Sequence, residues 1–188
     1  MMNAVYNDST PEASVGIVSA LHVPERPRAL SVQAGNIPDM LKQQHAWVCW
    51  RYVWDGTKWR KVPFQPDRRP ASSTDPATWS SFDVVMSAYG RGKFDGIGFA
   101  LDGRPDDTGL VLAGVDLDDV TDSPERMEWA RQIVAEFGSY TEWSPSGEGL
   151  RIFGFAKPLP RGINRDGIEL YTSGRYLTVT GHVFGGIA

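Results

Sequence analysis

Cysteine is almost absent from this sequence of 188 residues, which contains only Cys49. A single cysteine excludes a disulfide within the chain and any cysteine-based zinc module that the chain would build alone. We therefore expect no zinc. The low cysteine content also fits a reducing compartment.

Long hydrophobic runs and the features of a signal peptide are missing as well. No apolar run approaches the ~18 residues that a membrane-spanning helix needs. The N-terminal stretch MMNAVYNDSTPEAS lacks a basic start and an apolar core, which a secretory signal would have. We expect a cytoplasmic protein with no membrane partner.

Positive charge is in short supply overall, with 19 Lys and Arg against 23 Asp and Glu and a net charge of −4. A dedicated non-specific DNA-binding protein is more often basic. Many acids lie between residues 102 and 148, whereas basic residues gather at 58–69 and 151–175. Such a pattern suits an enzyme that holds metal ions and attracts a polyanion. Ordinary surface charge is the alternative.

Apolar residues make up 41% of the chain and aromatic residues 11%, with seven Trp, so a substantial core is expected. Residues 1–35 are rich in Pro, Ser, Gly and Ala without sustained periodicity, and we interpret them as a flexible N-terminal arm. Residues 36–188 then form one folded domain. The sequence contains no internal repeat and no low-complexity tract.

Local signals predict helices mixed with short strands. Three helices are expected: one capped by Asn36 and ending near Gln44, one after Ser80 or Ser81, and one after Ser123. An Asp-Gly turn joins residues 46–54 to 59–64 as a hairpin, residues 96–101 and 110–118 are expected to be adjacent strands, and short strands follow from about residue 140. The fold class is therefore α+β: a mainly antiparallel sheet with helices on one face, preceded by a small αβ unit.

Three aspartates follow a buried strand in the segment VLAGVDLDDV (111–120). Alternation puts Asp116 and Asp118 on one strand face. Two carboxylates about 6–7 Å apart suit hard cations and would otherwise repel one another. The alternative is an Asp-rich turn, with Asp119 or Asp122 as a cap.

The segment SPSGEGLRI (144–152) combines hydroxyls, glycines and a base. Glycine lets backbone N–H groups turn toward an anion, and a guanidinium matches phosphate oxygens. Ser144, Ser146 and Arg151 are therefore candidate phosphate ligands. A simple turn that joins two strands is the competing interpretation.

Glu169 alternates with apolar neighbours in GIELYTSGRYLTVTGH (167–182). A lone acid of this kind is usually on the solvated face of a strand. Arg175 and Tyr176 begin the next strand, where Tyr176 is either a cross-strand aromatic or a ring that packs against a sugar. His182 is expected to be exposed rather than catalytic.

The order of these segments resembles that of the archaeo-eukaryotic primase superfamily, specifically the primase–polymerase domains of phages, plasmids and integrative elements. That family has a DxD strand, an SxGxGhH-like strand and a later strand with an acid. The corresponding segments here are VDLD (115–118), SPSGEGLRI (144–152) and IELY (168–171). The resemblance covers roughly residues 37–182, and its specificity lies in the combined order and spacing.

The resemblance implies an RRM-like fold and template-directed nucleotidyl transfer by a DNA primase or polymerase. Its implied catalytic and metal-binding residues are Asp116, Asp118 and Glu169, which would hold two Mg²⁺ or Mn²⁺ ions. The implied nucleotide-binding residues are Ser144, Ser146, Arg151, Arg175, Tyr176 and Lys61. Lys61 could instead be a surface lysine lying over Trp59. The implied partners are nucleoside triphosphates, a single-stranded DNA template and a replicative helicase, fused or separate.

One residue departs from the family pattern, because Arg151 stands where the second motif commonly has His. Arginine is always charged and still suits a triphosphate, but it cannot perform a step that needs an imidazole. Two other functions stay open. One is a non-catalytic module that binds single-stranded DNA or an origin. The other is a metal-dependent nuclease, which also uses clustered acids but needs no triphosphate site.

Overall fold

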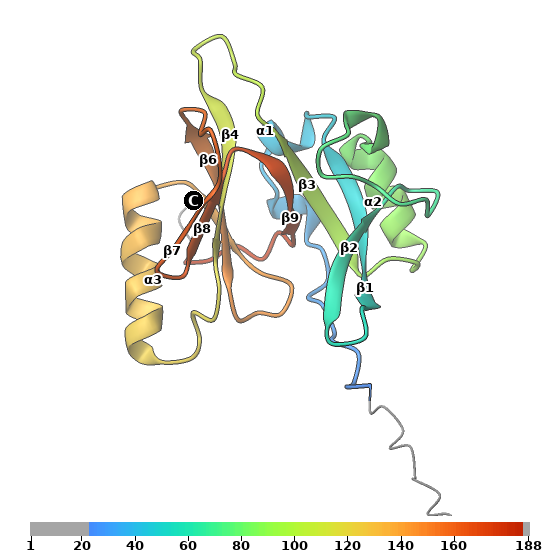
Figure 1. Cartoon of the computed structure of the whole chain (residues 1–188), viewed down its shortest axis with the longest axis horizontal. Helices are drawn as coiled ribbons and strands as arrows, with labels where there is room; N and C mark the ends of the chain where they lie inside the picture. Colours follow the sequence, from blue (N-terminus) through green and yellow to red (C-terminus); the bar gives the residue numbers. More distant parts are fainter. Residues whose placement is uncertain (1–22, 186–188) are drawn as a thin grey trace, which may run out of the picture.

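Two antiparallel sheets form the body of the protein in a computed structural model that describes residues 23–185. The four-stranded sheet has the order β2-β1-β3-β9 and the five-stranded sheet the order β5-β6-β4-β8-β7. Figure 1 shows α3 beside the five-stranded sheet and α2 beside the four-stranded one. The strands are β1 (Trp47–Trp54), β2 (Trp59–Phe64), β3 (Gly96–Asp102), β4 (Val111–Leu117), β5 (Tyr140–Trp143), β6 (Leu150–Ala156), β7 (Ile163–Arg165), β8 (Ile168–Tyr171) and β9 (Ser173–Val179). The α-helices are α1 (Asp39–Lys42), α2 (Phe82–Gly90) and α3 (Pro124–Phe137), and short 3-10 turns lie at η1 (Ala34–Asn36) and η2 (Pro76–Thr78).

The β1–β2 hairpin and helix α3 confirm two local predictions. In the hairpin turn, the Asp55 carboxylate accepts hydrogen bonds from the backbone N–H groups of Thr57 and Lys58, both at 2.8 Å. At the start of α3, Ser123 Oγ accepts from the backbone N–H of Arg126 at 3.2 Å. The helix ends at Gly138, whose φ of 54° favours glycine. In each case the residues that fix the element lie within a few positions of it.

The first helix is shorter than predicted. We expected it to begin at Asn36, but α1 runs only from Asp39 to Lys42, with Pro38 at the N-cap position. The side chain of Asn36 does not cap this helix. Its Nδ2 donates to the carbonyl oxygens of Gln33 (side chain, 2.9 Å) and Gly181 (backbone, 3.0 Å). The Asn36 side chain, which the local pattern predicted to cap a helix, therefore makes a tertiary contact with Gly181 instead.

Strands β3 and β4 are not neighbours, although their sequences predicted adjacent strands. β3 pairs with β1 and β9, whereas β4 pairs with β6 and β8. The last strand, β9, thus completes the sheet that the N-terminal hairpin begins. β3 and β4 belong to different sheets because strand pairing depends on long-range packing. The sequence of two consecutive strands carries no local signal that says whether they pair with each other.

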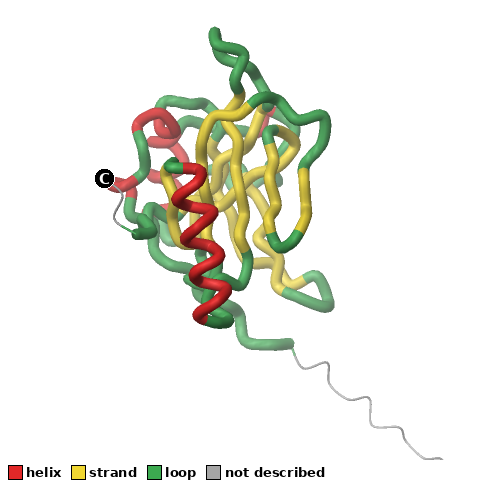
Figure 2. The backbone as a smooth tube through the Cα atoms, turned by 90° about the vertical axis from the view of Figure 1, so that its left-hand side faces the viewer, coloured by secondary structure: helices red, strands yellow, loops and turns green. Residues whose placement is uncertain are grey.

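The connection from β4 through α3 to β5 crosses over β6, which lies between the two strands. This is a split β–α–β unit. Figure 2 shows α3 lying along one face of this sheet. The apolar residues on that face pack against the helix and form a core. The sheet contributes Val115, Leu117, Leu150 and Ile152, and the helix contributes Ala130, Ile133 and Val134. The RRM-like arrangement as a whole stays a prediction.

The opposite face of the five-stranded sheet turns toward the four-stranded sheet. Phe153 on β6 packs edge-on against Phe99 on β3, with ring centroids 6.4 Å apart. Gly114 lies beneath Leu177 on β9, where a Cβ would overlap the leucine side chain. The two sheets therefore share one core at this end, and charged residues occupy the rest of the same face.

Part of the expected N-terminal arm can be described, namely residues 23–35. Apart from η1 it has no regular structure, but hydrogen bonds hold it to β2 and to the segments that follow β5 and β9. The Pro24 carbonyl accepts from the Trp59 indole at 3.0 Å, the Leu30 N–H donates to the Pro145 carbonyl at 2.8 Å, and the Gln33 N–H donates to the Thr180 carbonyl at 2.7 Å. Residues 1–22 of the predicted arm lie outside the described residues. Within residues 23–185, no helix has the length and apolar character needed to traverse a bilayer.

Candidate active site

A row of polar side chains crosses the five-stranded sheet. Residues that lie directly opposite one another on paired strands point to the same face. The strand registers pair Asp116 with both Arg151 and Glu169, Glu142 with Arg151, and Asn164 with Glu169. The row thus places two of the predicted metal ligands, Asp116 on β4 and Glu169 on β8, directly opposite each other on paired strands. Asp116 lies at its centre.

Arg151 and Asp116 form an ion pair within this row. Arginine Nη1 pairs with aspartate Oδ1, and the two side chains are 7% and 13% exposed. Arg151 Nη1 also donates to the Leu150 carbonyl at 3.2 Å, while its Nε is buried without a hydrogen-bond partner. Burial lowers the pKa of the guanidinium, and the charge of Glu169 opposes that shift. A buried cation with a spare donor is suited to an anionic ligand.

Glu169 is held by two neighbours. Asn164 Nδ2 donates to Oε1 at 2.7 Å, and the Tyr171 hydroxyl donates to Oε2 at 2.8 Å. Arg175 in turn donates to the Tyr171 hydroxyl at 3.1 Å, and its guanidinium lies 4.7 Å from the Tyr171 ring centroid. Arg175 therefore reaches the site through Tyr171 rather than through a direct contact with Glu169.

Asp118 lies one residue beyond the end of β4 and is exposed. Partial desolvation raises the pKa of its carboxyl group, and the like charges of Asp119 and Glu169 add to this. The nearby cations of Lys61 and Arg126 act in the opposite direction. Asp119 adopts a left-handed backbone conformation, with φ of 55°. Asp118 is thus the exposed end of the acidic cluster.

The loop of residues 144–149 closes on itself beside the acidic strand end. The Ser144 N–H donates to the Gly149 carbonyl at 2.7 Å, and the Gly149 N–H donates to Ser144 Oγ at 3.1 Å. Ser146 Oγ lies 3.1 Å from Ser144 Oγ and is the more exposed of the two hydroxyls. A Cβ at Gly149 would lie 2.7 Å from the Leu117 carbonyl oxygen, so the close approach to β4 requires glycine.

Two predicted residues come to this region from the four-stranded sheet. Lys61 is half-buried on β2, where burial lowers the pKa of its ammonium group to about 8 and the positive charge of Arg151 contributes further. The Tyr176 hydroxyl donates to the Lys61 carbonyl at 2.5 Å. The ring of Tyr176 covers Gly98, where a Cβ would lie 2.7 Å from ring atom Cδ2. Lys61 therefore lies within electrostatic reach of Arg151, and the Tyr176 hydroxyl is already engaged.

Glu142 is a residue that sequence reasoning missed. It is fully buried and accepts hydrogen bonds from the Tyr140 hydroxyl (2.6 Å) and from the N–H groups of Thr180 (2.8 Å) and Gly181 (2.7 Å). Burial raises the pKa of this carboxyl group to about 7. The alternation of Thr141, Glu142 and Trp143 was the available signal, since it puts the acid on one face alone.

The structure brings Asp116, Glu169 and Arg151 together and places Asp118 and Lys61 near them. It does not bring the hydroxyls of Ser144 and Ser146 into contact with these groups. Within the part of the chain that the structure describes, no three Asp, Glu, His or Cys side chains gather closely enough to hold a metal ion. His182, which was predicted to be exposed, is half-buried, and its ring contacts Ser31 and Gln33.

Comparison with known proteins gives one clear match. No protein-family model matches the chain. A curated relative, the DNA primase-polymerase of Nitratiruptor phage NrS-1, is 40% identical over 156 residues. The match covers 78% of this chain and 20% of the relative, so the chain spans about a fifth of that protein's length. This similarity confirms the resemblance carried by the three motifs, and the chain belongs to the phage-type primase–polymerase domains.

Proposed function

We propose that the chain performs template-directed nucleotidyl transfer, as a DNA primase, a DNA polymerase or both, in the replication of a phage or another mobile element. The name of the phage relative supports this assignment. The structural observation that carries it is the row in which Arg151, Asp116 and Glu169 lie side by side on three adjacent strands. Acids and a phosphate-binding cation are thereby combined on one face.

Asp116, Asp118 and Glu169 are the proposed ligands for two divalent ions, and they would have to draw closer together than they are in this structure to hold them. Their carboxylate oxygens are the donors that Mg²⁺ and Mn²⁺ prefer. Asp116 and Glu169 are cross-strand partners, a relationship that puts Cα atoms about 4.5–5.5 Å apart. When bound, such ions help to ionise an attacking 3′-hydroxyl and neutralise the charge of the leaving pyrophosphate. Asp116 must exchange its contact with Arg151 for this role.

The cations of the site are proposed to bind the triphosphate. Arg151 supplies buried guanidinium donors, of which Nε has no partner, and Lys61 adds a charge from the opposing sheet. Arg175 extends this positive region through its contact with Tyr171. The hydroxyl of Ser146 is exposed at the neighbouring loop, whereas Ser144 shapes that loop.

The remaining elements of the proposal concern template and sugar. A single-stranded DNA template is the expected polymer partner, and a replicative helicase, fused or separate, is the expected protein partner. Tyr176 is proposed to contact a sugar with its ring alone, because its hydroxyl donates to the Lys61 carbonyl. Its effect on the choice between ribo- and deoxyribonucleotides would then be steric.

The deciding experiment is nucleotide incorporation on single-stranded DNA, with and without a primer, in Mg²⁺ and in Mn²⁺. Asp118→Asn should lower incorporation at least about 100-fold if the acid holds a catalytic ion. Asp119→Asn is the matched control, because asparagine tolerates the left-handed conformation at this position. The unprimed reaction separates primase from polymerase activity.

Three outcomes would replace the proposal. DNA binding without incorporation by the folded wild-type chain would identify a non-catalytic binding module. Shortening of labelled DNA in the same reactions would identify a metal-dependent nuclease. Equal loss of activity in both asparagine variants would show that net charge, rather than a ligand at Asp118, sets the rate.

A further inference from the structure

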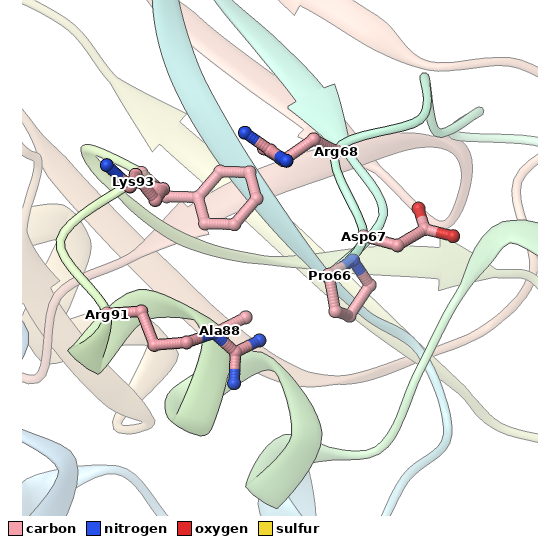
Figure 3. Close-up of a pocket in the computed structure, with 7 residues that line it drawn as sticks. Pro66, Asp67, Arg68, Ala88, Arg91 and Lys93 are labelled. Atoms are coloured by element: carbon pink, nitrogen blue, oxygen red, sulfur yellow. The ribbon is translucent and has the colours of Figure 1, made fainter.

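A basic hollow lies outside the catalytic row, on the four-stranded side of the molecule. It has a volume of about 430 Å³ and opens between the loop after β2, the end of α2 and the turn into β3. Arg68, Arg91 and Lys93 line it, with Phe94 and Ala88 as its apolar wall. Figure 3 shows these three basic side chains around the hollow, while the Asp67 carboxylate points away from it.

The positive charge of this basic hollow is not neutralised locally. Within residues 23–185, none of the three basic side chains forms an ion pair. Asp67 is paired instead with Arg69, at 2.7 Å. All three cations are exposed, so they are available to a ligand in solution.

A fourth cation lies behind the aromatic wall. The Arg51 guanidinium is 4.3 Å from the Phe64 ring centroid and 6.0 Å from that of Phe94. Its Nε is buried and has no hydrogen-bond partner. The charge of Arg51 therefore adds to the positive potential near the hollow.

Three other surface arginines are arranged differently. Arg104, Arg131 and Arg165 each lie within 4 Å of an acid on a neighbouring position of their own segment, respectively Asp102, Glu128 and Asp166. Their fields are thus largely cancelled. The basic hollow differs from these positions in that, within the described part of the chain, it gathers three unpaired cations around one concave site.

We propose that the basic hollow binds a backbone phosphate of single-stranded DNA at a second point of contact, away from the catalytic row. The loop that carries Arg68 follows β2 directly, and β2 carries Lys61. Lys61 points toward the five-stranded sheet, whereas Phe64 and the hollow lie on the α2 face of the same sheet as Lys61. Because β2 is the edge strand, a strand of DNA that leaves the catalytic row reaches the hollow by passing around this edge. A concave hollow admits a single strand more readily than a convex duplex. The inference extends the proposed function and rests on it for the identity of the strand.

The test compares DNA binding by two triple variants of the whole chain. Arg68→Gln/Arg91→Gln/Lys93→Gln removes the charge of the hollow, and Arg104→Gln/Lys157→Gln/Arg161→Gln removes the same charge elsewhere. Fluorescence anisotropy with a labelled oligothymidine would be recorded between 50 and 300 mM salt, about the range in which phosphate contacts dominate. Each contact contributes about 0.7 to the slope of log K against log salt. The first variant should therefore lose a slope of about 2 and bind at least about tenfold more weakly at low salt, whereas the second should resemble the wild type.

Each alternative outcome overturns the proposal. Equal slope losses in the two variants would mean that net charge alone governs binding, and no loss in the first would remove the hollow from the DNA path. A loss seen with duplex but not with the single strand would contradict the assigned ligand. Because binding is measured without incorporation, a wild-type chain that binds through the hollow but adds no nucleotide would refute only the catalytic proposal.

Discussion

Arg151 on β6 and Asp116 on β4 face each other across paired strands, and their side chains form an ion pair that is almost wholly buried. The guanidinium thus engages the carboxylate that is proposed to hold a metal ion. Under the proposed function, metal binding at Asp116 would be coupled to the position of Arg151. Release of Arg151 from Asp116 would also free its donors for phosphate.

Replacement of Arg151 by glutamine should strengthen metal binding in the absence of nucleotide. The variant removes the cation that competes for Asp116, and a gain of about tenfold corresponds to about 1.4 kcal/mol. Calorimetric titration with Mn²⁺ measures this affinity. Arg175→Gln removes the same charge without touching Asp116 and is the control. An unchanged or weaker Mn²⁺ affinity in Arg151→Gln would contradict the coupling.

Asp116→Asn should destabilise the fold far more than Asp118→Asn. The first variant leaves Arg151 buried without a charged partner, a change that costs about 3 kcal/mol or more, whereas Asp118 is exposed and its replacement should cost within about 0.5 kcal/mol. Urea denaturation gives both free energies of unfolding. The double variant Asp116→Asn/Arg151→Gln should recover part of the loss. Additive losses would argue against the ion pair.

Lys61 should make nucleotide affinity depend on pH. Because burial lowers the pKa of its ammonium group to about 8, only about one molecule in ten keeps this charge at about pH 9. The affinity for a nucleoside triphosphate should therefore fall as pH rises from 7 to 9, as measured by calorimetry. Lys61→Arg should show a flat profile in this range, since arginine stays charged. A fall of the same size in both proteins would assign the pH effect to another group.

Glu142 should make the wild-type fold less stable as pH rises through neutrality. Burial raises its pKa in the folded state to about 7 from the ordinary value of 4.5, so the folded state holds the proton more tightly than the unfolded state. The resulting stabilisation is complete below about pH 4.5 and is lost between there and about pH 7, with a maximum of roughly 3 kcal/mol. Unfolding free energies at several pH values would reveal it. Glu142→Gln should lose this dependence, although it also loses one acceptor for the N–H groups of Thr180 and Gly181.

The sequence correctly predicted those elements whose defining residues lie close together in the chain. The β1–β2 hairpin and α3 belong to this class, since Asp55, Ser123 and Gly138 act within their own turns. Alternation also gave the correct face for Asp116 and Glu169, which the strand register pairs. Such predictions succeed because backbone geometry determines which side a residue faces, whatever strand lies beside it.

Strand partners could not be obtained in this way. Nothing local to β9 indicates that Val179 pairs with Ile97 rather than with the strands that precede it. β7 was not predicted because it has only three residues, all exposed. The contacts of residues 23–35 with the rest of the domain were not predicted, for a different reason. Its contacts use backbone groups such as the Pro24 carbonyl, which every residue type offers.

The late arrival of β9 bears on synthesis of the chain at the ribosome. β3 presents its buried residues Ile97 and Phe99 on a strand whose partner edge stays open until β9 emerges. At ~5–20 residues per second, the roughly 70 intervening residues take about 4–14 s to be translated. During that interval the nascent chain carries an unpaired strand edge, which is a site for association with other chains. Chaperone binding to nascent chains that end before β9 is the consequence that this topology implies.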